Sequence, residues 1–161
     1  MLINFYNNDL AIRNHYAISS HTIVDDTIVM KQDTITTIPF NNYIISSGSG
    51  MSKTSDGGIT IPAGAYAICG SVYIDHDKVS SNGRVGRSVH VFDSNDIEYI
   101  CARFNQYLVA NTGPYEGYST GTKIIVFNKQ TTLYLKARSL SVSASAFLTN
   151  TGTFLSIIRL R

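Results

Sequence analysis

The side chains with the clearest binding chemistry gather in one segment rich in turn-forming residues, 109–121 (VANTGPYEGYSTG). In this segment Tyr115, Glu116 and Tyr118 lie among glycine and proline, so we expect a surface loop. Tyrosine rings present an apolar face that stacks on sugar rings, and a carboxylate accepts hydrogen bonds from sugar hydroxyls. The segment therefore predicts a saccharide-binding site, and the alternative is that these are ordinary loop residues.

A second expected loop, 76–87 (HDKVSSNGRVGR), carries Arg84 and Arg87. The planar guanidinium group presents several donors in a fixed fork, which suits phosphate and carboxylate groups. The two arginines are therefore predicted to contact phosphate or acidic glycans. The alternative is again that they are ordinary solvated loop residues.

No pattern of catalytic residues is found in the chain. It contains no G-x-S-x-G, no phosphate-binding loop and no H-E-x-x-H. Residues 75–77 (DHD) offer two carboxylates for a cation, but an acidic loop tip is more often simply solvated. The histidines are scattered: His15, His21, His76 and His90. We therefore expect a protein that is not an enzyme and that holds no metal or cofactor.

The two cysteines, Cys69 and Cys101, lie in apolar runs. Neither has a cysteine or histidine beside it in the sequence at the spacing of metal ligands. Each is interpreted as a buried free thiol. A single disulfide is the alternative if their strands prove to be neighbours.

Composition narrows the class of protein. The 161 residues suit one domain, and charged residues make up only 15%, below the usual share of about 25%. A net charge of +2 does not indicate nucleic-acid binding. No apolar run is long enough to insert in a membrane, and the first residues do not resemble a secretory signal.

The elements that must position these residues are short runs of β-branched and aromatic residues separated by turns. Such runs are typical of an all-β antiparallel sandwich. Strands are predicted near 21–30, 34–38, 43–46, 59–62, 65–75, 88–93, 97–105, 122–128, 131–138, 142–148 and 153–160.

One of these strands is unusually poor in charge, because residues 58–74 (GITIPAGAYAICGSVYI) hold no charged side chain. An antiparallel strand normally alternates apolar residues on the core side with polar residues on the water side. Here the second face carries small residues and tyrosine instead. An exposed surface of this kind usually contacts a partner, so the pattern predicts an oligomer.

Four elements of the segment 34–160 carry a common pattern: residues 38–42 (IPFNN), the Pro-x-Gly-x-Tyr element at 62–66, the hairpin at 124–135 (IIVFNKQTTLYL) and the closing strands at 147–160. Through these elements the segment resembles the trimeric jelly roll of the tumour necrosis factor and complement component one-q globular-head superfamily. The resemblance implies a β-sandwich, a jelly roll of tumour necrosis factor-like type, that assembles as a homotrimer. The implied trimer-interface residues are Tyr66, Tyr73, Tyr134, Leu155 and Ile157.

The resemblance and the composition together predict a trimeric attachment head on a bacteriophage virion or fibre, binding a saccharide on the host surface. Residues 1–20 would form a docking segment that joins the head, 21–161, to the larger assembly. The protein would be made in the host cytoplasm without a signal peptide and would act on the virion surface. The alternative is a structural or decoration protein of a virion or cell-surface assembly that binds no host ligand.

Overall fold

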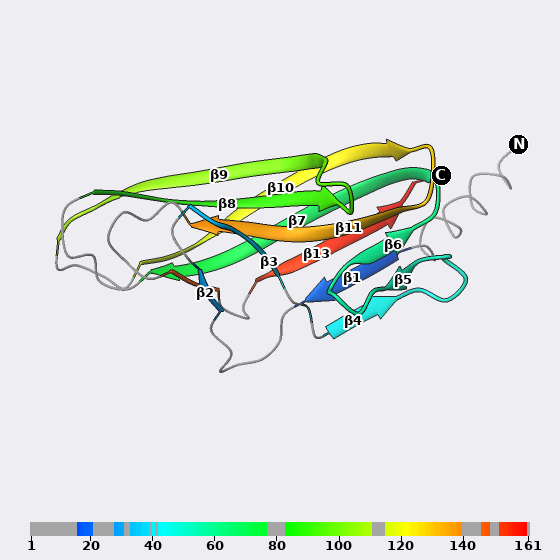
Figure 1. Cartoon of the computed structure of the whole chain (residues 1–161), viewed down its shortest axis with the longest axis horizontal. Helices are drawn as coiled ribbons and strands as arrows, with labels where there is room; N and C mark the ends of the chain where they lie inside the picture. Colours follow the sequence, from blue (N-terminus) through cyan, green and yellow to red (C-terminus); the bar gives the residue numbers. More distant parts are fainter. Residues whose placement is uncertain are drawn as a thin grey trace, which may run out of the picture.

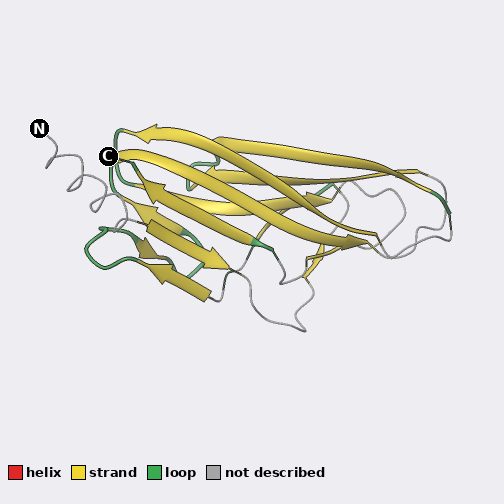
Figure 2. Cartoon of the chain, turned by 180° about the vertical axis from the view of Figure 1, so that it is seen from behind, coloured by secondary structure: helices red, strands yellow, loops and turns green. Residues whose placement is uncertain are grey.

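The computed structural model describes residues 16–20, 28–30, 33–38, 40, 42–76, 83–110, 115–139, 146–148 and 152–160. Over these ranges the chain consists of strands joined by turns and loops, arranged as two facing antiparallel sheets (Figures 1 and 2). No helix in the described ranges has the length and apolarity that crossing a membrane requires. The expected all-β antiparallel sandwich is confirmed.

Sheet A is seven-stranded in the described part of the chain, and its strands run in the order β2-β12-β7-β13-β1-β4, with β10 on the other edge of β7. The strands are β1 (Tyr16–Ser20), β2 (Ile28–Met30), β4 (Asn42–Ile45), β7 (Gly64–His76), β10 (Tyr115–Phe127), β12 (Ala146–Leu148) and β13 (Phe154–Arg159). The long pairing of β10 with β7, from Tyr115 opposite His76 to Phe127 opposite Gly64, fixes which residues share a face.

Sheet B is six-stranded over the same ranges, in the order β5-β6-β11-β8-β9, with β3 also paired to β11. The strands are β3 (Ile35–Thr37), β5 (Ser52–Lys53), β6 (Ile59–Ile61), β8 (Gly83–Asp93), β9 (Glu98–Leu108) and β11 (Thr131–Ser139). The edges of the two sheets meet where the Ser119 hydroxyl of β10 donates to the carbonyl oxygen of Ala102 of β9, at 2.7 Å.

Three segments differ from the prediction. Residues 16–20, assigned to a docking segment, pair with β13 and β4 and so belong to the sandwich. The segments 83–87 and 115–121, expected in loops, are the beginnings of the long strands β8 and β10. Residues 1–15, where a docking role remains a prediction, lie outside the described residues, as do most residues of the predicted strand 21–30.

The core fills the space between the sheets and is aliphatic at its centre. Alternate residues of β7 (Tyr66, Ile68, Val72 and Ile74) are fully buried against Val89 and Val91 of β8 and Leu133, Leu135 and Ala137 of β11. On β13, the inward residues are Leu155 and Ile157. Burial of this apolar surface is the main favourable contribution to folding.

Two paired glycines allow the sheets to approach each other closely. Gly70 of β7 lies opposite Gly121 of β10, and both face sheet B. A Cβ atom on Gly70 would lie 2.6 Å from Leu135 Cδ1, and one on Gly121 would lie 2.5 Å from Ile100 Cγ2. Glycine is required here because side chains of sheet B occupy the space that a methyl group would need.

The turn between β8 and β9 is organised by one carboxylate. Asp93 Oδ1 accepts hydrogen bonds from the backbone N–H groups of Asn95, at 2.8 Å, and Ile97, at 3.0 Å, and Oδ2 accepts one from the Tyr99 hydroxyl at 3.2 Å. Burial disfavours the charged form of Asp93, but these hydrogen bonds outweigh it and lower the pKa. This turn lies between the predicted strands near 88–93 and 97–105.

The glycine pair gives the first testable prediction. Gly70→Ala should lower the free energy of unfolding by about 1–3 kcal/mol, because the added methyl group overpacks the core. Urea unfolding at fixed protein concentration measures this change. Gly83→Ala is the matched control, since nothing lies within 4 Å of a Cβ at that position. Equal unfolding midpoints for both variants and the wild type would contradict the role given to Gly70.

The Asp93 carboxylate gives a second prediction. Because its pKa is lower in the folded protein, its stabilising contribution is present above the unfolded-state pKa of about 3.9 and is lost as pH falls through the folded value. Asp93→Asn should cost at least about 1 kcal/mol at pH 7, and the difference from wild type should shrink in acid. Thermal unfolding of both proteins at a series of pH values measures this difference in stability. Asp96→Asn, in an exposed ion pair, is the control and should change stability less.

Candidate functional site

The described side chains of sheet A that point away from the core form a surface without charge, here called the uncharged face. Its described side chains are Asn42, Ile44, Ala65, Ala67, Cys69, Ser71, Tyr73, Tyr118, Thr120, Thr122, Ile124, Val126, Phe154, Ser156 and Ile158. Beyond Tyr73 and Tyr118 the register continues to Asp75 and Glu116, whose side chains lie outside the described residues.

Large apolar side chains lie exposed across several strands of the uncharged face. Ile124 and Val126 of β10 are 68% and 67% exposed, and Ile44 of β4 is 52% exposed. Ile124 and Ile158 lie opposite Ala67 from its two sides, so they form one row across β10, β7 and β13. A contiguous row of this kind indicates a contact surface, since isolated exposed apolar residues would not line up in register.

One end of the uncharged face is aromatic. The rings of Tyr73 and Tyr118 lie 4.6 Å apart between centroids. Tyr118 also packs over Gly152, where a Cβ atom would lie 2.2 Å from Tyr118 Cε1. Gly152 has a φ of 78°, which glycine adopts without strain. Tyr118 is therefore held by its neighbours while half of its surface stays exposed, at 51%.

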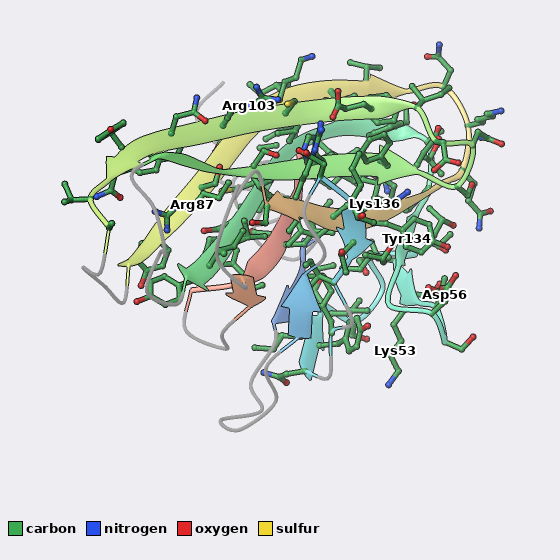
Figure 3. The ribbon with its side chains drawn as sticks, turned by 60° about the vertical axis from the view of Figure 1, so that its left-hand side comes forward. Lys53, Asp56, Arg87, Arg103, Tyr134 and Lys136 are labelled. Carbon is green, nitrogen blue, oxygen red and sulfur yellow. The ribbon has the colours of Figure 1, made fainter. Side chains whose placement is uncertain are left out.

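The outer face of sheet B has the opposite character (Figure 3). Lys136 Nζ lies 2.9 Å from Asp96 Oδ1, and Arg138 Nη2 lies 3.2 Å from Asp33 Oδ1. Lys136 also lies over the Phe92 ring, 4.6 Å from its centroid. One side of the sandwich thus carries ion pairs suited to water, and the other side carries none among the described side chains.

The Tyr134 hydroxyl, on sheet B, donates to Asp56 Oδ2 at 2.9 Å, and Thr54 donates to the other carboxylate oxygen (Figure 3). The hydrogen bonds from Thr54 and Tyr134 hold the pKa of Asp56 below its usual value. Burial, and then the hydrogen bond to Asp56, raise the pKa of Tyr134. A Cβ on Gly58 would lie 2.8 Å from Tyr134 Cε1, so this glycine is required for the packing.

An open hollow adjoins this network on sheet B, lined by Thr37, Asp56, Asp93, Ser94, Asp96, Tyr134 and Lys136. Each of its three carboxylates already has partners within the chain. A ligand would have to displace these hydrogen bonds. The hollow is therefore a weaker candidate for binding than the uncharged face.

The predicted interface residues do not all lie at the surface of the subunit. Tyr73 lies on the uncharged face, but Tyr66, Leu155 and Ile157 are 0% exposed in the core and cannot touch a second chain without unpacking it. The Tyr66 hydroxyl donates to the carbonyl oxygen of Pro62 at 2.8 Å. Tyr134 lies on sheet B. For β13, the outward residues are instead Phe154 and Ile158.

The predicted ligand residues do not lie on loops. Tyr115, Glu116 and Tyr118 are in β10, and Arg84 and Arg87 are in β8. The side chains of Tyr115, Glu116 and Arg84 lie outside the described residues. Their strand positions still fall at one end of the sandwich, because β10 begins opposite the end of β7 and β8 begins opposite the end of β9 (Figure 1).

Arg87 is fully buried between the sheets, so the prediction that it contacts an external phosphate or glycan is wrong (Figure 3). Its Nη1 donates to the carbonyl oxygen of Ile74 at 2.9 Å, and its guanidinium carbon lies 5.0 Å from the centroid of the Phe104 ring. Gly117 makes this possible, since a Cβ there would lie 2.8 Å from Nη1. Arg87 therefore acts as a core residue at this end of the sandwich.

The cysteines do not pair. Neither Cys69 nor Cys101 is in a disulfide, and they lie on the outer faces of different sheets. Cys101 is exposed, so its interpretation as a buried thiol is wrong. Cys69 is half-buried on the uncharged face.

Solved structures show the same fold. Eiger TNF from S. frugiperda matches with a TM-score of 0.55 and 11% identity, over 91% of this chain and 92% of that chain. Murine APRIL at pH 8.5 matches with a TM-score of 0.55 and 14% identity, over 90% of this chain and 98% of that chain. The chain therefore has the tumour necrosis factor-like jelly-roll fold. No protein-family model and no curated protein sequence matches it.

Proposed function

We propose that the chain forms a homotrimeric, non-enzymatic binding head in which the uncharged face of each subunit packs against a sister subunit. The observation that carries this proposal is the absence of charge on the described outer face of sheet A, opposite the ion-paired face of sheet B. The likeness in fold to Eiger TNF and APRIL supports it. In a closed ring of three copies, a neighbouring subunit covers the uncharged face of every subunit, so none of these faces stays exposed to water.

The energetics favour burial of this face. A stable interface buries at least about 1,000 Å² in total, and apolar surface contributes about 25 cal/mol per Å² removed from water. Burying the outer face of sheet B would instead require desolvating or breaking its ion pairs, which costs several kcal/mol for each ion. The subunits therefore associate through sheet A.

The trimer gives a third testable prediction. Ile124→Lys should shift the protein from trimer toward monomer at micromolar concentration, because each interface would have to bury an unpaired ammonium group. Multi-angle light scattering measures the mass. Ile97→Lys is the matched control, because Ile97 is also exposed, at 52%, but lies in the β8–β9 turn. A wild-type mass equal to that of one 17.7 kDa chain would overturn the proposal.

We further propose that the trimer is the attachment head of a virion and binds a host-surface saccharide at the end of the sandwich that holds Tyr115, Glu116 and Arg84. These residues begin β10 and β8 at the same end, which supports a common site. Tyr118 lies on the uncharged face and is assigned to subunit contact. Residues 1–15 would join the head to the particle, on whose surface the protein would act.

The saccharide site gives a fourth prediction. Glu116→Gln should weaken binding of purified trimer to host-surface polysaccharide by at least about tenfold, because hydrogen bonds to a charged acceptor are worth about 1.5–3 kcal/mol. Asp96→Asn, in the exposed β8–β9 turn of sheet B, is the matched control and should bind as the wild type does. Glycan arrays and intact host cells provide the measurement. A trimer that binds no host surface would favour the structural or decoration role instead.

A further inference from the structure

Three side chains with metal-binding atoms converge on the outer face of sheet B. His90 of β8 lies directly opposite Cys101 of β9, and Glu98 lies at the irregularity where the register of these strands shifts. One ligand atom from each of His90, Glu98 and Cys101 lies within 4.8 Å of the other two. Neighbouring strands thus bring together residues that have no metal-ligand spacing in the sequence.

The imidazole of His90 is oriented from both sides. Its Nδ1 contacts Glu98 Oε1, and its Nε2 lies 2.7 Å from Ser88 Oγ. Nδ1 is therefore the nitrogen that faces the cluster. A histidine that binds a metal typically donates its other N–H to an acceptor that does not itself contact the metal, and this hydrogen bond fixes the tautomer. Ser88 can provide this acceptor, because a hydroxyl group both donates and accepts.

One of the three side chains is buried and held in place, and the other two are exposed and can adjust to a metal ion. His90 is 4% exposed and Ser88 is 0% exposed, so the imidazole is held in place, while Glu98 and Cys101 are exposed. In a tetrahedral zinc site neighbouring ligand atoms lie about 3.5 Å apart, given metal–ligand distances of about 2.0–2.3 Å. The three ligand atoms lie within 4.8 Å of one another, so the exposed side chains need to shift by only about 1 Å, and Glu98 Oε1, now hydrogen-bonded to His90 Nδ1, has to move away from it to reach that spacing.

The nearby ammonium group of Lys136 does not pair with His90, Glu98 or Cys101. Lys136 of β11 lies opposite His90 in the register, but its ammonium group contacts Asp96 and the Phe92 ring. The carboxylate of Glu98 and a thiolate of Cys101 would supply the negative charge that a divalent ion needs. Imidazole and thiolate together select zinc and similar borderline-soft ions over calcium or magnesium, which prefer oxygen.

We propose that His90, Glu98 and Cys101 bind a zinc-class divalent transition-metal ion, with water as the fourth ligand. On binding, the thiol of Cys101 gives up its proton to solvent, and His90 binds through Nδ1 as the neutral imidazole whose single proton, on Nε2, is donated to Ser88 Oγ. The ion then links β8 to β9 beside the irregularity between them. This site is independent of trimer formation, since the uncharged face lies on the other sheet.

The same residues do not form a nucleophilic triad. Ser88, His90 and Glu98 are connected in the order of a serine–histidine–carboxylate relay. However, Ser88 is 0% exposed, so its hydroxyl cannot reach an external substrate. The exposed members of the cluster are the carboxylate and the thiol, which are metal ligands.

Titration of the reduced, chelator-treated protein with Co²⁺ and Zn²⁺ at neutral pH tests the site. With Co²⁺, the wild type and Cys69→Ser should both show a thiolate-to-metal charge-transfer band, and Cys101→Ser should lack it. With Zn²⁺ in calorimetry, Cys101→Ser and Glu98→Gln should each bind at least about tenfold more weakly, and Ser88→Ala about 10–100-fold more weakly. Circular dichroism confirms that each variant is folded.

Because Glu98 and Cys101 are exposed, their variants should fold, and the result can be interpreted directly. The proposal is overturned if the wild type binds no Zn²⁺, or if Cys101→Ser retains the charge-transfer band and the wild-type affinity. Loss of the band in Cys69→Ser alone would also overturn it, since that cysteine lies on sheet A.

Discussion

The unequal distribution of charge between the two sheets is the constraint on which the functional interpretation depends. Both sheets bury one face in a common core, but their outer faces differ, because sheet B carries the Lys136–Asp96 and Arg138–Asp33 pairs. Sheet A instead presents Ile124, Val126 and Ile158. A single chain gains nothing in water from this arrangement, whereas copies of the chain gain by covering the uncharged face with one another.

The sequence predicted the sandwich and the low-charge strand, but it assigned the core residues Tyr66, Leu155 and Ile157 to an interface, for a physical reason. Alternation divides a strand into two faces, yet it does not say which face is the core when both are apolar. Leu155 and Ile158 are equally apolar and lie on opposite faces of β13. Only the pairing of β13 with β7, in which Leu155 lies opposite the inward-facing Gly70, shows that Leu155 faces the core and Ile158 faces outward.

Glycine residues were the reason for a second wrong prediction, that of two loops. Glycines in 83–87 and 115–121 indicated loops, but both segments are strands, and in 115–121 the glycines allow close packing. Gly117 accommodates Arg87, and Gly121 accommodates Ile100. The His90–Cys101 pair was missed for a related reason, because strand pairing brings together residues that a search for short spacings treats as unrelated.

The buried guanidinium of Arg87 has a consequence for how the molecule can vary. It fills the space between the sheets near the end of β7, where its contacts are a backbone carbonyl, an aromatic ring and an amide. At this end of the sandwich the contacts of the Arg87 guanidinium hold the two sheets together, in addition to the aliphatic core. Substitutions at this end can therefore be accommodated there while sheet A, which carries the proposed subunit interface, keeps its shape.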